Sequence, residues 1–197
     1  DTALARARSR SRRMTRNAPG RMGSADIAAL PFKAELVEPR EIDKVSGSDA
    51  VRQGVLPEAG PLRRKRLDAL GDTRLVLVLD QVTDPHNVGA ILRSAAAFGA
   101  AAVIVPDRHA PPETGVLAKS ASGALETVPY IHAGNLSQTI EKLKGANFWL
   151  AGMDGYAEQT LAEAKLKGRV GIIMGSEGEG LRRLTRENCD FLVKLPM

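Results

Sequence analysis

Residues 175–180 have the composition and spacing of a ligand-binding loop. Their sequence is GSEGEG, so the glycines follow the pattern G-x-x-G-x-G, and Glu177 and Glu179 lie between them. Loops that cradle phosphates instead follow G-x-G-x-x-G or end in Gly-Lys-Ser/Thr, and neighbouring carboxylates would repel a phosphate. The pattern therefore favours a ligand with hydroxyls, amines or a positive centre. A tight turn with a charged tip is the simpler alternative.

Two polar residues, Asn87 and Arg93, are further candidates, and they lie at and within a helical pattern from about Val88 to Phe98. Asn87 has the position of an N-cap, and Gly99 ends the pattern as a helix-terminating glycine. Residues six apart on a helix lie roughly 9 Å apart along the axis and about 120° apart around it. Asn87 and Arg93 therefore do not form one site by themselves. Taken alone, they suit a cap and a surface cation.

Apolar runs alternate with helical patterns from residue 75 onward. The run LVLVL at residues 75–79 is continuously apolar, which is typical of a strand covered on both faces. Further strands are expected at residues 101–105, 128–131, 148–151, 170–174 and 192–195, and helices at residues 88–98, 113–120 and 136–144. This alternation predicts an α/β domain with a mostly parallel sheet.

Three segments follow expected strands at their carboxyl ends, where α/β sheets bind ligands. Residues 80–90 follow the first clear strand, and the acidic glycine loop follows the strand at 170–174. The third segment, residues 195–197, follows the last strand. The carboxyl edge of the sheet is thus the expected functional site.

The first sixty residues have a weaker pattern. Residues 1–22 are basic and irregular, and the next expected elements are a helix near residues 25–30, a strand at 34–37, a helical turn at 41–45 and a short strand at 54–56. Prolines and glycines then interrupt regular structure before the basic run at 63–66. We therefore predict a small N-terminal domain at residues 1–60, a basic linker at 61–73 and the main domain at 74–197.

The net charge of +5 is concentrated at one end of the chain. Residues 1–22 hold seven arginines against the single acidic residue Asp1, so this segment carries +6 and the remainder −1. Localised positive charge suits a nucleic-acid backbone, which it binds through counterion release. A solvated arm that keeps the protein soluble explains the charge equally well.

The composition limits the kinds of protein that this sequence can encode. The 197 residues are 43% hydrophobic and 26% charged, as in a soluble globular protein. The longest apolar stretches are too short to span a bilayer. The arginine-rich N-terminus lacks the apolar segment of a secretory signal, although a mitochondrial presequence has a similar composition. Cys189 is the single cysteine, which excludes an internal disulfide and a thiolate metal cluster. We expect a cytoplasmic protein that binds neither membrane nor metal.

Three motifs in order resemble those of the SpoU (TrmH-like) family of RNA ribose methyltransferases, in the SPOUT superfamily. The first motif is LDxVxDPxNxGAIxRxA at residues 79–95, followed by Phe98-Gly99. The second is IMGSEGEGL at residues 173–181, and LPM at residues 195–197 resembles the opening of the third. The tract 175–190 is especially similar to members that methylate a guanosine 2′-hydroxyl in the peptidyl-transferase region of 23S rRNA.

The resemblance implies a trefoil-knotted α/β fold, an exception to the near absence of knots in proteins. It also implies a homodimer with the active site near the subunit interface, and S-adenosylmethionine as cofactor. The ribose, amino group and sulfonium of this molecule suit the acidic loop. By the match of motifs, Gly175, Leu195 and Met197 belong to the cofactor pocket, and Glu177 lies close by.

The resemblance further implies that Arg93 is the catalytic residue and that Asn87 is its neighbour. The methyl group is already activated on sulfur, so the enzyme must align it and make the ribose hydroxyl more nucleophilic. A guanidinium stays protonated in proteins. We therefore expect Arg93 to orient a phosphate and to stabilise the developing alkoxide. The implied substrate is 23S rRNA, with tRNA as the second choice.

The chain departs from the family pattern at both ends. Residues 38–41 and 47–55 resemble the tail of a small RNA-binding domain whose opening Gly-x-His segment is absent here, so we expect this domain to be incomplete. The family's third motif continues through a glycine into a Ser-Leu-Asn-Val-Ser-like stretch, whereas this sequence ends at Met197. A polypeptide ending there is expected neither to close the knot nor to be active.

Two other classes stay open from the sequence. A nucleotide-dependent oxidoreductase would share the α/β pattern, but the acidic glycine loop disfavours it. A non-catalytic RNA-binding protein on a decayed methyltransferase fold agrees with the shortened third motif.

Overall fold

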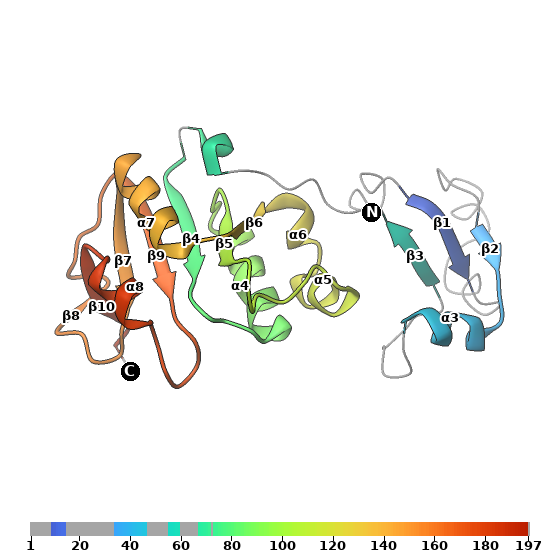
Figure 1. Cartoon of the computed structure of the whole chain (residues 1–197). Coiled ribbons are helices and arrows are strands. Elements are labelled where there is room, and N and C mark those ends of the chain that lie inside the picture. Colours follow the sequence, from blue (N-terminus) through green and yellow to red (C-terminus); the bar gives the residue numbers. More distant parts are fainter. Residues whose placement is uncertain (1–8, 15–33, 47–54, 60–66, 72, 197) are drawn as a thin grey trace. The chain divides into compact units, whose positions relative to one another are not determined.

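The computed structural model describes residues 9–14, 34–46, 55–59, 67–71 and 73–196. The chain divides into two compact units, residues 1–63 and residues 64–197 (Figure 1). The expected helix near residues 25–30, the basic run at 63–66 and the cofactor candidate Met197 lie outside the described residues.

Among its described residues, the N-terminal unit contains a three-stranded sheet and one helix. Strand β1 (Ser9–Met14) lies in the middle, parallel to β2 (Ala34–Leu36) and antiparallel to β3 (Val55–Ala59). Helix α3 (Pro39–Ser46) buries Ile42. The elements β2, α3 and β3 confirm the expected ones. Strand β1 shows that the expectation of an irregular basic segment is wrong for these six residues.

The C-terminal unit contains a seven-stranded sheet in the order β6-β5-β4-β9-β7-β10-β8, with every pairing parallel. Its strands are β4 (Leu75–Leu79), β5 (Val103–Pro106), β6 (Tyr130–Ala133), β7 (Phe148–Met153), β8 (Gln159–Thr160), β9 (Arg169–Met174) and β10 (Phe191–Lys194). Its helices are α4 (Pro85–Ala97), α5 (Gly115–Ala121), α6 (Ala124–Thr127), α7 (Leu136–Gly145) and α8 (Arg183–Glu187), and a short 3-10 helix, η1 (Leu67–Leu70), precedes β4. The predicted parallel α/β sheet is confirmed.

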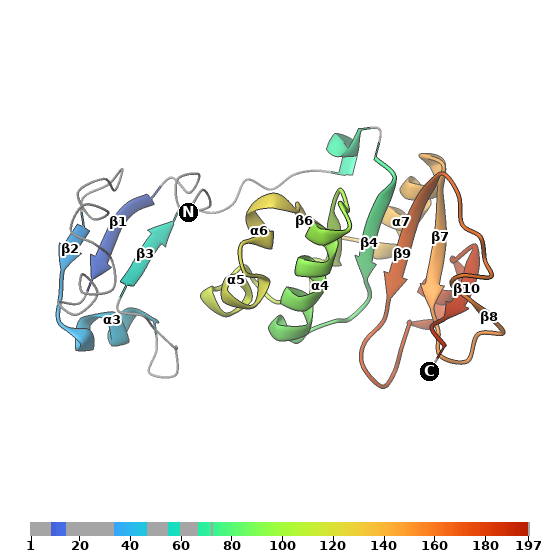
Figure 2. The ribbon, with the colours of Figure 1, turned by 180° about the vertical axis from the view of Figure 1, so that it is seen from behind.

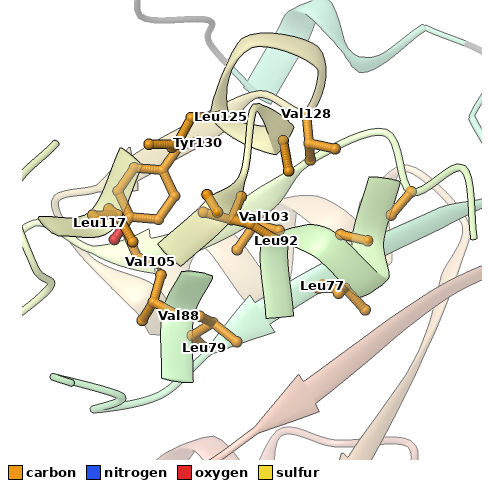
Figure 3. Packing of buried hydrophobic residues seen from close by; sticks show 14 residues of the cluster. Leu77, Leu79, Val88, Leu92, Val103, Val105, Leu117, Leu125, Val128 and Tyr130 are labelled. Carbon is orange, nitrogen blue, oxygen red and sulfur yellow. The ribbon is translucent and has the colours of Figure 1, made fainter. Parts of the chain in front are cut away.

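Helices cover the sheet on both faces. Helices α4, α5 and α6 lie over β4, β5 and β6, where Leu92 of α4 packs into a cluster of buried side chains from all three strands (Figure 3). On the other face, Ile140 and Leu143 of α7 pack against residues such as Leu150 and Ile173. Figure 2 shows the face of β9 and β7 that no described helix covers. Each of the fully buried aliphatic side chains contributes about 1.5–3 kcal/mol to stability.

The elements of the C-terminal unit that the sequence pattern missed are short. Helix α6 has four residues, α8 five and β8 two, so none spans enough chain to show a period. The long strands and helices begin or end within about two residues of the predicted bounds, with α4 starting three residues earlier. The trefoil knot stays a prediction.

Candidate functional site

The first two motifs meet because β4 and β9 are neighbours. Leu79 pairs with Met174 at the last step of the ladder, and the backbone N–H of Asp80 donates to the Met174 carbonyl over 2.7 Å. In parallel strands the carboxyl ends lie at the same edge of the sheet. The segments that follow β4 and β9 therefore begin side by side. The third motif follows β10, which is separated from β9 by β7.

The acidic glycine loop is a small hairpin. Ser176 and Gly180 exchange two backbone hydrogen bonds, of 3.1 and 3.0 Å. Gly178 and Gly180 have φ values of +89° and +70°, which side-chain-bearing residues rarely adopt. A Cβ on Gly175 would overlap the Gly180 carbonyl group and the Leu181 nitrogen. The fold of the loop itself thus requires three glycines, and Gly175 is needed whether or not a ligand approaches it.

A buried carboxylate ties this loop to the first motif. Asp80 has no exposed surface, and its two oxygens accept hydrogen bonds from the Arg182 backbone N–H (3.0 Å) and the Arg182 Nε (2.6 Å). The Arg182 side chain is about half exposed. Since Arg182 lies two residues after the hairpin, at the N-cap position of α8, this pair fixes where the loop returns to the sheet.

Asn87 and Glu177 form the second connection between the motifs. The Asn87 side-chain amide donates to Glu177 Oε2 over 3.5 Å, a long hydrogen bond between exposed groups. Asn87 is not the helix cap that the sequence predicted. Helix α4 begins at Pro85, and Asp84 caps it by accepting from the His86 N–H. Asn87 therefore lies inside the first turn, which directs its side chain toward the acidic loop.

Arg93 lies six residues further along α4, about one and two-thirds turns, and is bound to a different element. Its guanidinium donates to the Ser120 carbonyl of α5. The two helices approach closely at Gly89, where a Cβ would lie 2.8 Å from the Ser120 carbonyl carbon. Ser120 also donates its hydroxyl to the His86 carbonyl over 3.1 Å. Among the described residues, no hydrogen bond joins Arg93 to Asn87 or Glu177, as the helical spacing predicted.

The third motif lies two strands away from the second. Leu195 follows β10 and is 56% exposed at the carboxyl edge. Between β9 and β10 lies the exit of β7, where the backbone N–H of Asp154 donates to the Val193 carbonyl over 2.9 Å. Neither Asp80 nor Asp154 is among the site residues that the sequence predicts. Each follows directly on an apolar strand, which is the signal that could have identified both.

Other groups in the described part of the chain do not add to this site. Burial raises the pKa of the Cys189 thiol to about 11, so it is a poor nucleophile near neutral pH. A cavity of about 510 Å³ lies at the opposite, amino edge of the sheet, between Leu67, Leu70, Phe148 and Arg169. The described residues include no cluster of His, Cys, Asp or Glu suited to a metal ion, and no helix long and apolar enough to cross a membrane.

Comparison with known proteins identifies the family. The sequence model described as "SpoU rRNA Methylase family" matches residues 74–197. The chain belongs to this family. It is 47% identical over 167 residues to the 23S rRNA (guanosine-2'-O-)-methyltransferase RlmB of Pseudomonas putida, a match that covers 81% of this chain and 66% of that protein. RlmB of Escherichia coli K12 is 46% identical over 154 residues, a match that covers 75% of this chain and 63% of the length of that RlmB. The chain thus spans about two thirds of the length of these relatives.

Solved structures share the fold. The SpoU methyltransferase AviRb of Streptomyces viridochromogenes, crystallised with AdoMet, superimposes with a TM-score of 0.80 at 21% identity, over 100% of this chain and 77% of that one. An RNA 2'-O ribose methyltransferase superimposes with a TM-score of 0.77 at 27% identity, over 99% of this chain and 75% of the other. These similarities support the architecture of a SpoU methyltransferase.

The Asp80–Arg182 pair gives a direct test of the site's construction. Replacing Arg182 by glutamine leaves a completely buried carboxylate with the backbone N–H of residue 182 as its remaining partner. We expect the free energy of unfolding to fall by about 1–3 kcal/mol, the cost of removing a hydrogen-bond partner from a buried polar group. Arg183→Gln is the matched control, because Arg183 pairs with the exposed Glu187 on the same helix and should cost less than about 0.5 kcal/mol. Urea unfolding measures both, and equal losses would contradict the role of the pair.

Proposed function

We propose that this chain carries the catalytic domain of an S-adenosylmethionine-dependent methyltransferase that acts on a ribose 2′-hydroxyl of 23S rRNA. The observation that supports this most is the meeting of two family motifs at the junction of β4 and β9, through Asp80–Arg182 and Asn87–Glu177. The RlmB relatives, which bear the name of this activity, support the choice of substrate. Transfer RNA is the second candidate substrate.

The residues at the carboxyl edge fit the proposed cofactor. The hairpin offers the carboxylates of Glu177 and Glu179, both exposed, which suit an amino group or a sulfonium better than a phosphate. Leu195 offers an exposed apolar side chain at the same edge, two strands away from the hairpin. We infer that Gly175, Glu177, Leu195 and Met197 belong to the cofactor pocket.

For methyl transfer, the protein needs mainly to align the ribose hydroxyl with the methyl group and to stabilise the charge that develops on the ribose oxygen. S-adenosylmethionine, when bound, supplies a methyl group activated by a positive sulfur. We infer that Arg93 holds a phosphate of the RNA and stabilises the negative charge that develops on the ribose oxygen. Its bond to the Ser120 carbonyl fixes the guanidinium as a donor, which fits this role and not that of a base. Asn87, which lies on the same helix as Arg93, positions the acidic hairpin through its hydrogen bond to Glu177.

Removing the Arg93 guanidinium tests this assignment. The side chain is exposed, so Arg93→Ala should keep the fold and most of the affinity for S-adenosylmethionine. We expect methyl transfer to fall by roughly 10²- to 10⁴-fold, as for other positioned catalytic groups. The measurement is transfer of labelled methyl groups to rRNA lacking the modification. Arg74→Ala, an exposed arginine that precedes β4 at the amino edge, is the control. Wild-type turnover in R93A would remove Arg93 from the catalytic site.

We further propose that residues 1–60 recruit RNA, that residues 74–197 bind cofactor, and that the protein acts as a homodimer. The charge of +6 within residues 1–22 supports the first part. Deleting residues 1–60 should weaken RNA binding and flatten its dependence on salt, because fewer phosphates are neutralised. Cofactor affinity and the dimer should not change. RNA titrations at several salt concentrations check this. Equal salt slopes for both proteins would show that the arginine segment is only a solvated arm.

A further inference from the structure

The turn that follows β7 occupies a central place at the carboxyl edge. Strand β7 pairs with β9 on one side and with β10 on the other, all in parallel. Its exit, residues 154–157, therefore lies between the exits of the second and third motifs. Neither motif includes these residues, and the function proposed above assigns nothing to them.

A single carboxylate fixes the shape of this turn. Asp154 Oδ1 accepts from the Tyr156 N–H over 2.9 Å, and the Asp154 carbonyl accepts from the Ala157 N–H over 3.1 Å. Asp154 Oδ2 forms an ion pair of 3.0 Å with the Arg186 Nε of α8, and only 12% of the Asp154 side chain is exposed. Ala157 is buried and anchors the far end. The backbone on both sides of Tyr156 is thus held in place.

The side chain that this rigid turn presents is an aromatic ring in solvent. Tyr156 is 96% exposed, the highest value among the large apolar side chains that the structure describes. Its hydroxyl has no hydrogen-bond partner in the described residues. By contrast, the exposed Trp149 packs against Phe191 with ring centroids 5.8 Å apart. Exposed aromatic rings are side chains on which proteins stack unpaired nucleobases, and here the backbone that carries the ring is fixed.

We propose that Tyr156 is an RNA-binding residue that stacks on an unpaired base next to the methylated nucleotide. This inference rests on the function proposed above and adds a contact on the substrate side of the site. Near-complete exposure favours a base arriving from solvent over the adenine of the cofactor, because a bound cofactor needs walls and Tyr156 has none beside it. Asp154 and Arg186 act as positioning residues that hold the turn.

The test compares Tyr156→Ala and Tyr156→Phe in binding to a transcript of the peptidyl-transferase region of bacterial 23S rRNA. Loss of one stacked base should weaken binding of Y156A about tenfold and raise the KM for RNA with little change in kcat. Y156F should bind like the wild type, because stacking needs the ring and not the hydroxyl. Phe98→Ala is the matched control, since Phe98 is 79% exposed but lies at the end of α4, at the amino edge.

The other outcomes separate the two proposals. If the wild type methylates the transcript and Y156A binds it equally well, the stacking role is wrong and the proposed function stands. Weaker binding of S-adenosylmethionine by Y156A would place the ring in the cofactor pocket, and a weakened dimer would place it in the subunit interface. Either result overturns the inference. If the wild type neither binds nor methylates the transcript or total rRNA, the proposed function fails and this inference fails with it.

Discussion

The carboxylate of Asp80 connects the two parts of the candidate site, the first motif after β4 and the acidic hairpin after β9. The geometry of both parts depends on the ion pair that this carboxylate forms. A fully buried charge is tolerated in a protein only with hydrogen-bonded partners. Here the partners are the backbone and side chain of Arg182, 102 residues further along the chain. The pair holds the loop of β9 against the end of β4, so that Asn87 reaches Glu177. The pair that joins the two motifs is therefore part of the folded sheet itself.

Glycines allow this assembly at two close approaches of the backbone. Gly175 lets the acidic hairpin close on itself, and Gly89 lets α4 approach α5 near Ser120. The first approach shapes the surface that faces the proposed cofactor. The second brings the Ser120 carbonyl within reach of Arg93. Both glycines belong to the family motifs, and the structure gives each a steric reason that does not require a bound ligand.

The sequence predicted those features that local pattern determines. The apolar run at residues 75–79 became β4 without change of bounds, and Gly99 ends α4 with a φ of +66°. Strand order is not determined locally, so the position of β7 between β9 and β10 could not be predicted. For the same reason, the position of Tyr156 at the carboxyl edge could not be predicted. The helical pattern from Val88 predicts Asn87 as the cap, but proline is favoured in the first turn of a helix, and α4 begins at Pro85 with Asp84 as its cap. The motifs select residues 79–95 and 173–181 as candidates, but only the fold shows that Asn87 contacts Glu177 and that Arg93 binds α5.

Amide hydrogen exchange of the whole chain, with and without S-adenosylmethionine, tests most directly the claim that the junction of β4 and β9 is a cofactor site. We expect slower exchange on cofactor addition in the hairpin at residues 175–181, at the start of α4 and after β10 at residues 194–196. Peptides around the amino-edge cavity, such as residues 142–148, should not change. Protection confined to the amino edge, or no protection at saturating cofactor, would contradict the account.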